Sequence, residues 1–301
     1  MRALSISTPL ALLLVALSAC SSGDPAGTGG TGGTGGTGGT GGTGGTGGAT
    51  ATTLRSGFIS MDSTLVDNGS GPTPHHNVSA EFAEAHITGP LLLPCTDTEV
   101  GNCRLLVCTP SSQPPSVETS PMSAGTITLS TPLTSLTLVP KADATYDTLS
   151  GFGSLWAPGD TVDVQVSGGE VPAFSTSVVA PSPVNVTAPA LDPATPLTID
   201  TTKDLAISWA GSSVGEVIAG VSTYSASEVA VLNCKFDPAT GHGVLPASLL
   251  GLLPKSGSAA CGVQQRSSTS LDAGEFSISV SVSIESMSQG KSAHAGGVTL
   301  K

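Results

Sequence analysis

One segment of the sequence matches the pattern of a hydrolytic nucleophile. Gly211-Ser212-Ser213-Val214-Gly215 fits G-x-S-x-G, in which the central serine, here Ser213, attacks a carbonyl carbon. Such a serine needs an acid and then a histidine later in the chain, and Asp237 is followed by His242 and His294. The motif also requires a sharp turn from a strand into a helix, whereas both flanks of Ser213 have the pattern of strands. We therefore predict no catalytic residues and keep a hydrolase that uses Ser213 as an alternative.

Three histidines form a second candidate site, for a metal ion. His75 and His76 are adjacent and His86 follows, with Glu81 and Glu84 between them. Imidazole and carboxylate groups are common ligands of transition metals. However, adjacent residues in a strand point to opposite faces, so His75 and His76 can share one ion only in a loop. We predict no metal and no cofactor, and the histidines remain the other possible centre of the alternative hydrolase.

The first twenty residues have the features of an export signal. Arg2 gives a positive start, an apolar run extends from Leu10 to Leu17, and Leu17-Ser18-Ala19-Cys20 ends it with small residues. The run is shorter than the roughly 20 apolar residues that a helix needs to span a bilayer. Leu-Ser-Ala-Cys resembles the lipobox of bacterial lipoproteins. The resemblance implies that the signal peptide, residues 1–19, is removed and that Cys20 receives diacylglycerol and an N-acyl chain such as palmitate.

The same resemblance implies a location. Several acyl chains hold a protein durably in a bilayer, because each buried methylene contributes about 0.8 kcal/mol. Ser21, rather than Asp, follows Cys20, and in this family that choice implies the outer membrane. We therefore expect an outer-membrane lipoprotein on the periplasmic or cell-surface side, which contacts the lipid bilayer through acylated Cys20.

Residues 20–53 comprise the lipidated cysteine and a linker. Seven consecutive Thr-Gly-Gly triplets run from Thr28 to Gly48. Such a segment has too few apolar side chains to offset its ordering entropy, and a flexible coil of this length spans on the order of 30 Å. The sequence predicts a disordered tether that holds the folded part away from the lipid.

Six cysteines become five once the first is lipidated, and export favours disulfide bonds. Cys234 and Cys261 lie in the second half, and we expect them to pair. Cys95 is expected to pair with either Cys103 or Cys108. Cys103 and Cys108 are five positions apart in an apparent strand, so their side chains point to opposite faces and a mutual bond is disfavoured. One thiol is then left free, and the absence of C-x2-C spacing argues against zinc.

Composition favours strands and excludes one class of partner. Charged residues make up only 11% of a chain rich in Ser, Thr, Val and Gly, a balance typical of strands and turns. The formal net charge of −12 repels phosphate backbones, so nucleic acid is not expected as a partner. It also repels anionic headgroups, which leaves the acyl chains as the membrane contact.

The clearest predicted strand is Phe276–Ile284, in which apolar residues alternate with serine. Only a strand places alternate residues on opposite faces, so its apolar residues should face a core and its serines water. We predict an all-β fold with two antiparallel β-sandwich domains, at 54–187 and 197–301. The proline-rich segment 188–196 is predicted to join them.

Residues 197–301 contain Leu205-Ala-Ile-Ser-Trp209 after a first strand at Leu197, then Phe276–Ile284, then a last strand at Val298. This order resembles the early tryptophan strand and the late strands of fibronectin type III and related immunoglobulin-like domains. The resemblance implies an immunoglobulin-like sandwich. The stretch Leu245–Leu253 departs from that pattern because it is expected to form a short helix.

No motif identifies a substrate or a ligand. We expect a lipid-anchored cell-envelope protein with a non-enzymatic binding or structural role, whose partner is an envelope or extracellular macromolecule. A glycan-binding module is a further alternative. Its platform for stacking against sugar rings would be Trp156, which lies near Gly151, Gly153 and Gly159, whereas Trp209 is expected in a core.

Overall fold

The computed structural model describes residues 52–67, 72–88, 95–109, 116–211, 214–225, 227–255, 257–295 and 297–301. Within these residues the chain is all-β, as predicted, apart from two very short helices. The lipobox, Cys20, the predicted tether up to residue 51 and Ser213 lie outside the described residues, and their predicted roles stay predictions; the last two residues of the predicted tether, Thr52 and Thr53, belong to the first strand instead.

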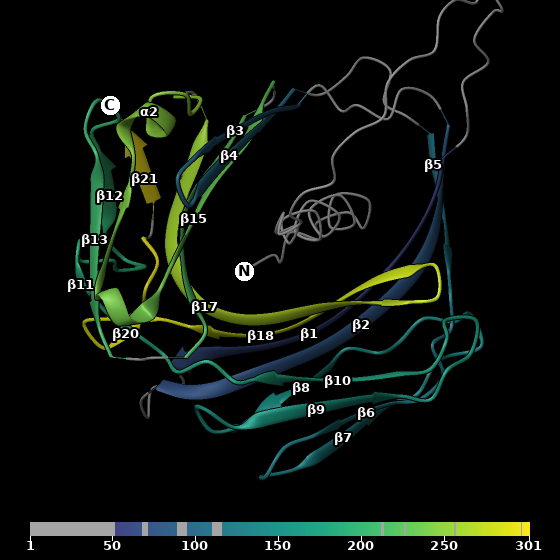
Figure 1. Ribbon diagram of the computed structural model, residues 1–301. Coiled ribbons are helices and arrows are strands. Elements are labelled where there is room, and N and C mark those ends of the chain that lie inside the picture. The colour runs from purple at the N-terminus through teal and green to yellow at the C-terminus, as the bar shows by residue number, and fades with distance from the viewer. Residues whose placement is uncertain are drawn as a thin grey trace, which may run out of the picture.

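A bent ten-stranded sheet dominates the described part of the chain (Figure 1). Its strands are β1 (Thr52–Asp67), β2 (Pro72–Thr88), β3 (Cys95–Val100), β4 (Cys103–Cys108), β5 (Ser116–Pro121), β8 (Leu149–Phe152), β14 (Glu216–Tyr224), β15 (Val229–Phe236), β17 (Ser258–Ala273) and β18 (Phe276–Glu285). They pair in the order β3-β4-β15-β14-β17-β18-β1-β2-β5, and β8 also pairs with β2. Neighbours are antiparallel except β1 and β18, which run parallel.

Smaller sheets cover the outside of the bend (Figure 1). A four-stranded sheet is built from β6 (Ile127–Ser130), β7 (Ser135–Leu138), β9 (Thr161–Val166) and β10 (Phe174–Val179), and it lies beneath β18, β1 and β2. A five-stranded sheet is built from β11 (Asn185–Ala188), β13 (Leu205–Ala210), β16 (His242–Leu245), β19 (Met287–Ser288) and β20 (Lys291–Ser292), and it lies beside β15 and β17. The remaining elements are the parallel pair β12 (Pro196–Ile199) and β21 (Gly297–Leu300), and the short helices η1 (Pro238–Thr240) and α2 (Ala247–Leu250).

The outer face of the large sheet carries two hydrophobic cores. Against the four-stranded sheet, β18 buries its alternate residues from Phe276 to Val282, together with Ile59 and Met61 of β1. Against the five-stranded sheet, Leu232 and its neighbours in β14 and β15 pack with Trp209, which is in a core as predicted. Each fully buried aliphatic side chain contributes about 1.5–3 kcal/mol, so these cores hold the smaller sheets in place.

The predicted boundary between two domains does not divide the large sheet. In that sheet β4 pairs with β15 and β1 pairs with β18, so the strands of segment 197–301 form a central block with strands of segment 54–187 on both sides. The two sandwiches exist, but they share one sheet and are not separate domains joined at 188–196. Alternation in a sequence shows which residues face a core, but it does not show which strands are neighbours.

Two disulfide bonds tie the edge of the large sheet together. Cys95 and Cys108 join β3 and β4, which is one of the two pairings that the sequence left open for Cys95. Cys103 is bonded to Cys234, which joins β4 to β15, so the predicted pair Cys234–Cys261 is wrong. In the strand register Cys103 lies directly opposite Cys234, whereas β14 separates Cys261 in β17 from β15. Two strand spacings amount to about 10 Å, which is beyond the reach of a disulfide.

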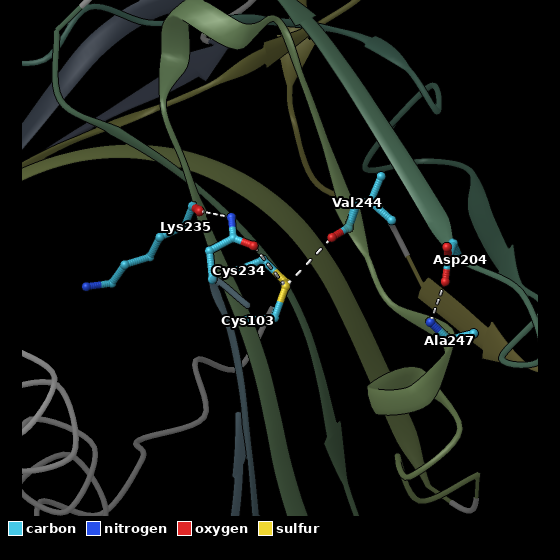
Figure 2. The surroundings of a disulfide bond; sticks show 7 residues. Cys103, Asp204, Cys234, Lys235, Val244 and Ala247 are labelled. Carbon is cyan, nitrogen blue, oxygen red and sulfur yellow. Dashed lines mark hydrogen bonds between the residues drawn. A yellow bond between two sulfur atoms is a disulfide. The ribbon is translucent and has the colours of Figure 1, made fainter. Parts of the chain in front are cut away.

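Figure 2 shows how the Cys103–Cys234 bond lies between the large sheet and β16. The sulfur of Cys103 is 3.7 Å from the carbonyl oxygen of Val244 in β16. The side chain of Asn102 donates to the carbonyl of Lys235 on the β15 side. The bond is thus enclosed by a core, which limits access of reductants.

Removing each disulfide should destabilise the protein to a different extent. The Cys103–Cys234 bond spans 131 residues and the Cys95–Cys108 bond spans 13. Loop-closure entropy assigns about 5 kcal/mol to the first and about 3 kcal/mol to the second. Urea unfolding should therefore give a larger loss for Cys103→Ala/Cys234→Ala than for Cys95→Ala/Cys108→Ala. A larger loss for the second variant would contradict the pairing.

The free thiol should be inert in the folded protein. Cys261 is buried, and burial raises the pKa of its thiol to about 12. Very little reactive thiolate is then present at pH 8. Iodoacetamide should leave Cys261 unmodified in the native protein and should modify it after unfolding without a reductant, as peptide mass spectrometry can show. Modification of Cys103 in that experiment would instead indicate a Cys234–Cys261 bond.

Candidate functional site

Ser213, the centre of the predicted serine motif, lies outside the described residues, but its flanks and the predicted partner residues are described. Gly211 and Val214, which flank the part of the motif outside the described residues, lie between strands β13 and β14 rather than between a strand and a helix. The carboxylate of Asp237 accepts the N–H of Ala239 at the start of η1. The Nδ1 atom of His242 lies 2.9 Å from the carbonyl oxygen of Thr240. Asp237 and His242 thus both interact with backbone groups of the turn between β15 and β16.

A different serine, histidine and carboxylate do meet, where β18 ends. Ser292 donates to Oε1 of Glu285, and its hydroxyl lies 2.6 Å from Nδ1 of His294. The same Nδ1 is 3.6 Å from Glu285 Oε1. In a catalytic triad the acid and the serine bind opposite nitrogens of the imidazole. Here both approach one nitrogen, so the cluster lacks the geometry that relays a proton from serine.

The structure keeps His86 apart from the other two histidines of the candidate metal site. All three lie on β2, where the rings of the adjacent His75 and His76 are stacked, with 6.5 Å between their centroids. His86 is ten residues beyond His76, which corresponds to about 33 Å along a strand. Its Nε2 atom is 2.8 Å from Oε1 of Glu84, which also pairs with Arg55. Within the described residues no group of three potential metal ligands lies close together.

An exposed aromatic ring lies near the position where the sequence suggested one. Trp156 is only 5% exposed and belongs to a core, so it is not a stacking platform. Phe152, in β8 of the same glycine-rich stretch, is 64% exposed. Its ring lies edge-on to His75, with 5.1 Å between the ring centroids. The glycines near Trp156 indicated the segment that carries an exposed ring, but only the pairing of β8 with β2 shows that this ring is Phe152.

The inner face of the large sheet, inside its bend, presents rows of polar side chains. Because the pairing is in register, residues of β17, β18, β1 and β2 line up across the strands. One row contains Arg266, Ser283, Asp62 and Asn77, and Ser150 of β8 extends it. The next row contains Ser268, Ser281, Ser60 and Ser79. On the other side of the first row, His75 pairs with Phe152, so the exposed ring borders the polar rows.

Hydrogen bonds hold the carboxylate of Asp62 in place. Its Oδ1 accepts the hydroxyl of Ser283 at 2.5 Å, and its Oδ2 accepts that of Ser60 at 2.9 Å. Arg266 stands in the same row; burial lowers the pKa of its guanidinium, and the carboxylates of Asp62 and Glu216 oppose that shift. Two rows away, where Glu81 pairs with Phe58, burial raises the pKa of Glu81. The inner face therefore offers oriented polar groups with partly restricted access to water.

This arrangement fits a ligand with many hydroxyl groups. Serine hydroxyls donate and accept, while amide, carboxylate and guanidinium groups are planar and can bind two neighbouring hydroxyls at once. The ring of Phe152 supplies an apolar surface at the border of these rows. Sequence alternation predicted that the serines of β18 point away from the core. It did not predict that serines from four strands would meet.

Within the described part of the chain, no helix is long and apolar enough to cross a bilayer. Comparison with known proteins does not assign the chain to a family: no family model matches it, and no curated protein sequence matches it.

Proposed function

We propose that this protein is a lipid-anchored cell-envelope protein with a non-enzymatic role, the binding of an uncharged polysaccharide on the inner face of its large sheet. The observation that carries the proposal is the meeting of polar rows with the exposed Phe152 and its neighbour His75. Hydroxyl, amide and carboxylate groups supply directional bonds, and the ring supplies contact with the apolar face of a sugar.

The repetition of the rows supports a polymer as the ligand. Successive residues on one face of a strand are about 6.6 Å apart, so similar polar groups recur along β17 and β18 at that interval. Charge supports a neutral polymer, because the chain carries a formal net charge of −12 and repels polyanions. The inner face is rich in serine, whereas interfaces between proteins are enriched in large apolar and aromatic side chains.

The anchor is the second part of the proposal. Leu17-Ser18-Ala19-Cys20 supports acylation of Cys20, with outer-membrane attachment supported by Ser21. The first strand begins at Thr52, so 31 residues separate it from Cys20. A tether of that length lets the inner face meet a polymer away from the lipid surface.

Substituting Phe152 should weaken polysaccharide binding without unfolding the protein. Loss of one aromatic contact of about 1 to 1.5 kcal/mol corresponds to about a tenfold weaker affinity for Phe152→Ala. Retardation in native gels that contain dextran, xylan or a β-glucan measures that affinity. Leu133→Ala is a matched control, because Leu133 is 58% exposed on the loop between β6 and β7. Equal retardation of Phe152→Ala and the wild type would argue against the proposed face.

Asn77→Ala tests the polar rows independently of the ring. Asn77 lies between Asp62 and Ser150 in the row that borders Phe152. We expect weaker retardation by neutral polysaccharides and an unchanged urea midpoint. Stronger binding of an acidic polysaccharide than of neutral ones would contradict the proposal.

Acylation can be tested on the mature chain. Mass spectrometry of the amino-terminal peptide should show Cys20 as the first residue, with the mass of diacylglycerol and one further acyl chain added. Cys20→Ala should release the protein from the membrane fraction. An unmodified Cys20, or cleavage at another site, would remove the anchor from the proposal and leave the binding face untouched.

A further inference from the structure

A cavity of about 260 Å³ lies where the ends of β1, β2 and β18 meet the segment 154–158 and the residues Pro183 and Met287. Ser63 and Ile284 of its lining alternate along their strands with Asp62 and Ser283 of the polar rows, so they belong to the outer face of the large sheet. Glu285, the last residue of β18, lies opposite Gln264 in the register and lines the cavity at the point where the chain leaves the sheet.

The walls of the cavity are largely apolar. They include Leu65, Leu155, Trp156, Ile284 and Met287, and three prolines lie among them. Trp156 is thus the ring of this cavity, although it is shielded from bulk water. A ligand that fills the cavity must therefore have an apolar body, and an aromatic or alicyclic body gives the best contact with such walls.

Two polar groups of the cavity, Nε2 of His76 and the carboxylate of Glu285, can accept hydrogen bonds from a ligand. Nδ1 of His76 lies 3.0 Å from the carbonyl oxygen of Gly153. A carbonyl only accepts, so Nδ1 carries the hydrogen, and in that tautomer Nε2 is an acceptor. Glu285 also lines the cavity, and a carboxylate is an acceptor alone. The two serine hydroxyls of the lining can act either way.

The carboxylate of Glu285 is held in place by hydrogen bonds. Its Oε2 accepts the backbone N–H of Leu65 at 3.1 Å, and its Oε1 accepts the hydroxyl of Ser292. Among the described residues its ion-pair contact is His294, at 3.6 Å, which carries charge only when protonated. A fixed carboxylate beside an apolar wall favours a cation that brings its own N–H donors.

We propose that this cavity binds a small organic cation, an ammonium group carried on an aromatic or alicyclic body. The ammonium donates to Glu285, and to Nε2 of His76 when the ligand reaches that far. The body packs against Trp156 and the aliphatic wall, where a cation near the indole gains further attraction. A neutral alcohol of the same shape lacks the charge, and a carboxylate of the same shape is repelled by Glu285.

Titration of the ¹⁵N-labelled protein with tryptamine tests the proposal. The chain has two tryptophans, so the spectrum contains two indole N–H resonances, and the unlabelled ligand contributes none. Trp209 is the internal control, because its Nε1 donates to the carbonyl of Pro238 in the other core. We expect a saturable shift of the Trp156 resonance, assigned with Trp156→Phe, and no shift of Trp209.

Variants of the protein and a neutral probe then test whether binding depends on the charge of the ligand and whether it occurs in this cavity. Glu285→Gln keeps the acceptor for Leu65 and removes the charge, so tryptamine should bind at least tenfold more weakly. Tryptophol, the neutral alcohol, should bind the wild type more weakly than tryptamine does and should be unaffected by Glu285→Gln. Glu118→Gln removes one charge from β5, far along the sheet, and should leave tryptamine binding unchanged. Ser154→Phe adds bulk at an exposed lining residue and should block every probe.

Four results would each overturn the proposal. One is equal affinity for tryptamine and tryptophol, and another is unchanged tryptamine affinity in Glu285→Gln. The third is the absence of a saturable shift at Trp156 with tryptamine, and the fourth is a shift at Trp209 of the same size. Each of these is independent of polysaccharide binding, which is measured on the inner face.

Discussion

The parallel pairing of β1 with β18 is the contact on which the arrangement depends. It joins the first described strand to one of the last, and it places β2, β5 and β8 on one side of the sheet and β17, β14 and β15 on the other. Without it the chain would form two smaller sheets, each with an extra unpaired edge. Unpaired edges are costly because they expose backbone donors and acceptors and invite association with other chains.

The two faces of this sheet follow from the same alternation but have opposite characters. On the outer face apolar residues of β1 and β18 lie side by side and bury against the four-stranded sheet. On the inner face the same register brings serines of these strands together with Asp62, Asn77 and Arg266. A shift of one residue would exchange the faces and bury the serines, so the hydrophobic core also fixes the positions of the polar rows. Stability and the proposed binding face are consequences of one register.

Local sequence patterns predicted individual strands and buried residues, but features that depend on which strands are neighbours could not be predicted. The alternation in Phe276–Ile284 predicted both the strand and its buried residues, and Trp209 was placed correctly in a core. Cys103–Cys234 could not be predicted, because the sequence does not show that β4 lies beside β15. Phe152 was missed for a similar reason: its exposure depends on β8 lying at the border of β2. Glu285 gave no signal in the sequence, because its position depends on the chain leaving the large sheet after β18.

The connectivity of the disulfides has a consequence for biogenesis. Cys103 lies within the loop closed by Cys95 and Cys108, yet its partner, Cys234, follows much later in the chain. Under the proposed export from its amino terminus, the chain would present Cys95, Cys103 and Cys108 to an oxidising compartment before Cys234, the partner of Cys103, arrives. Joining cysteines in their order of appearance would link Cys95 to Cys103 and trap a non-native hairpin. Maturation therefore requires either delayed oxidation or thiol–disulfide exchange, in which a mixed disulfide with a helper thiol releases Cys103 for its distant partner.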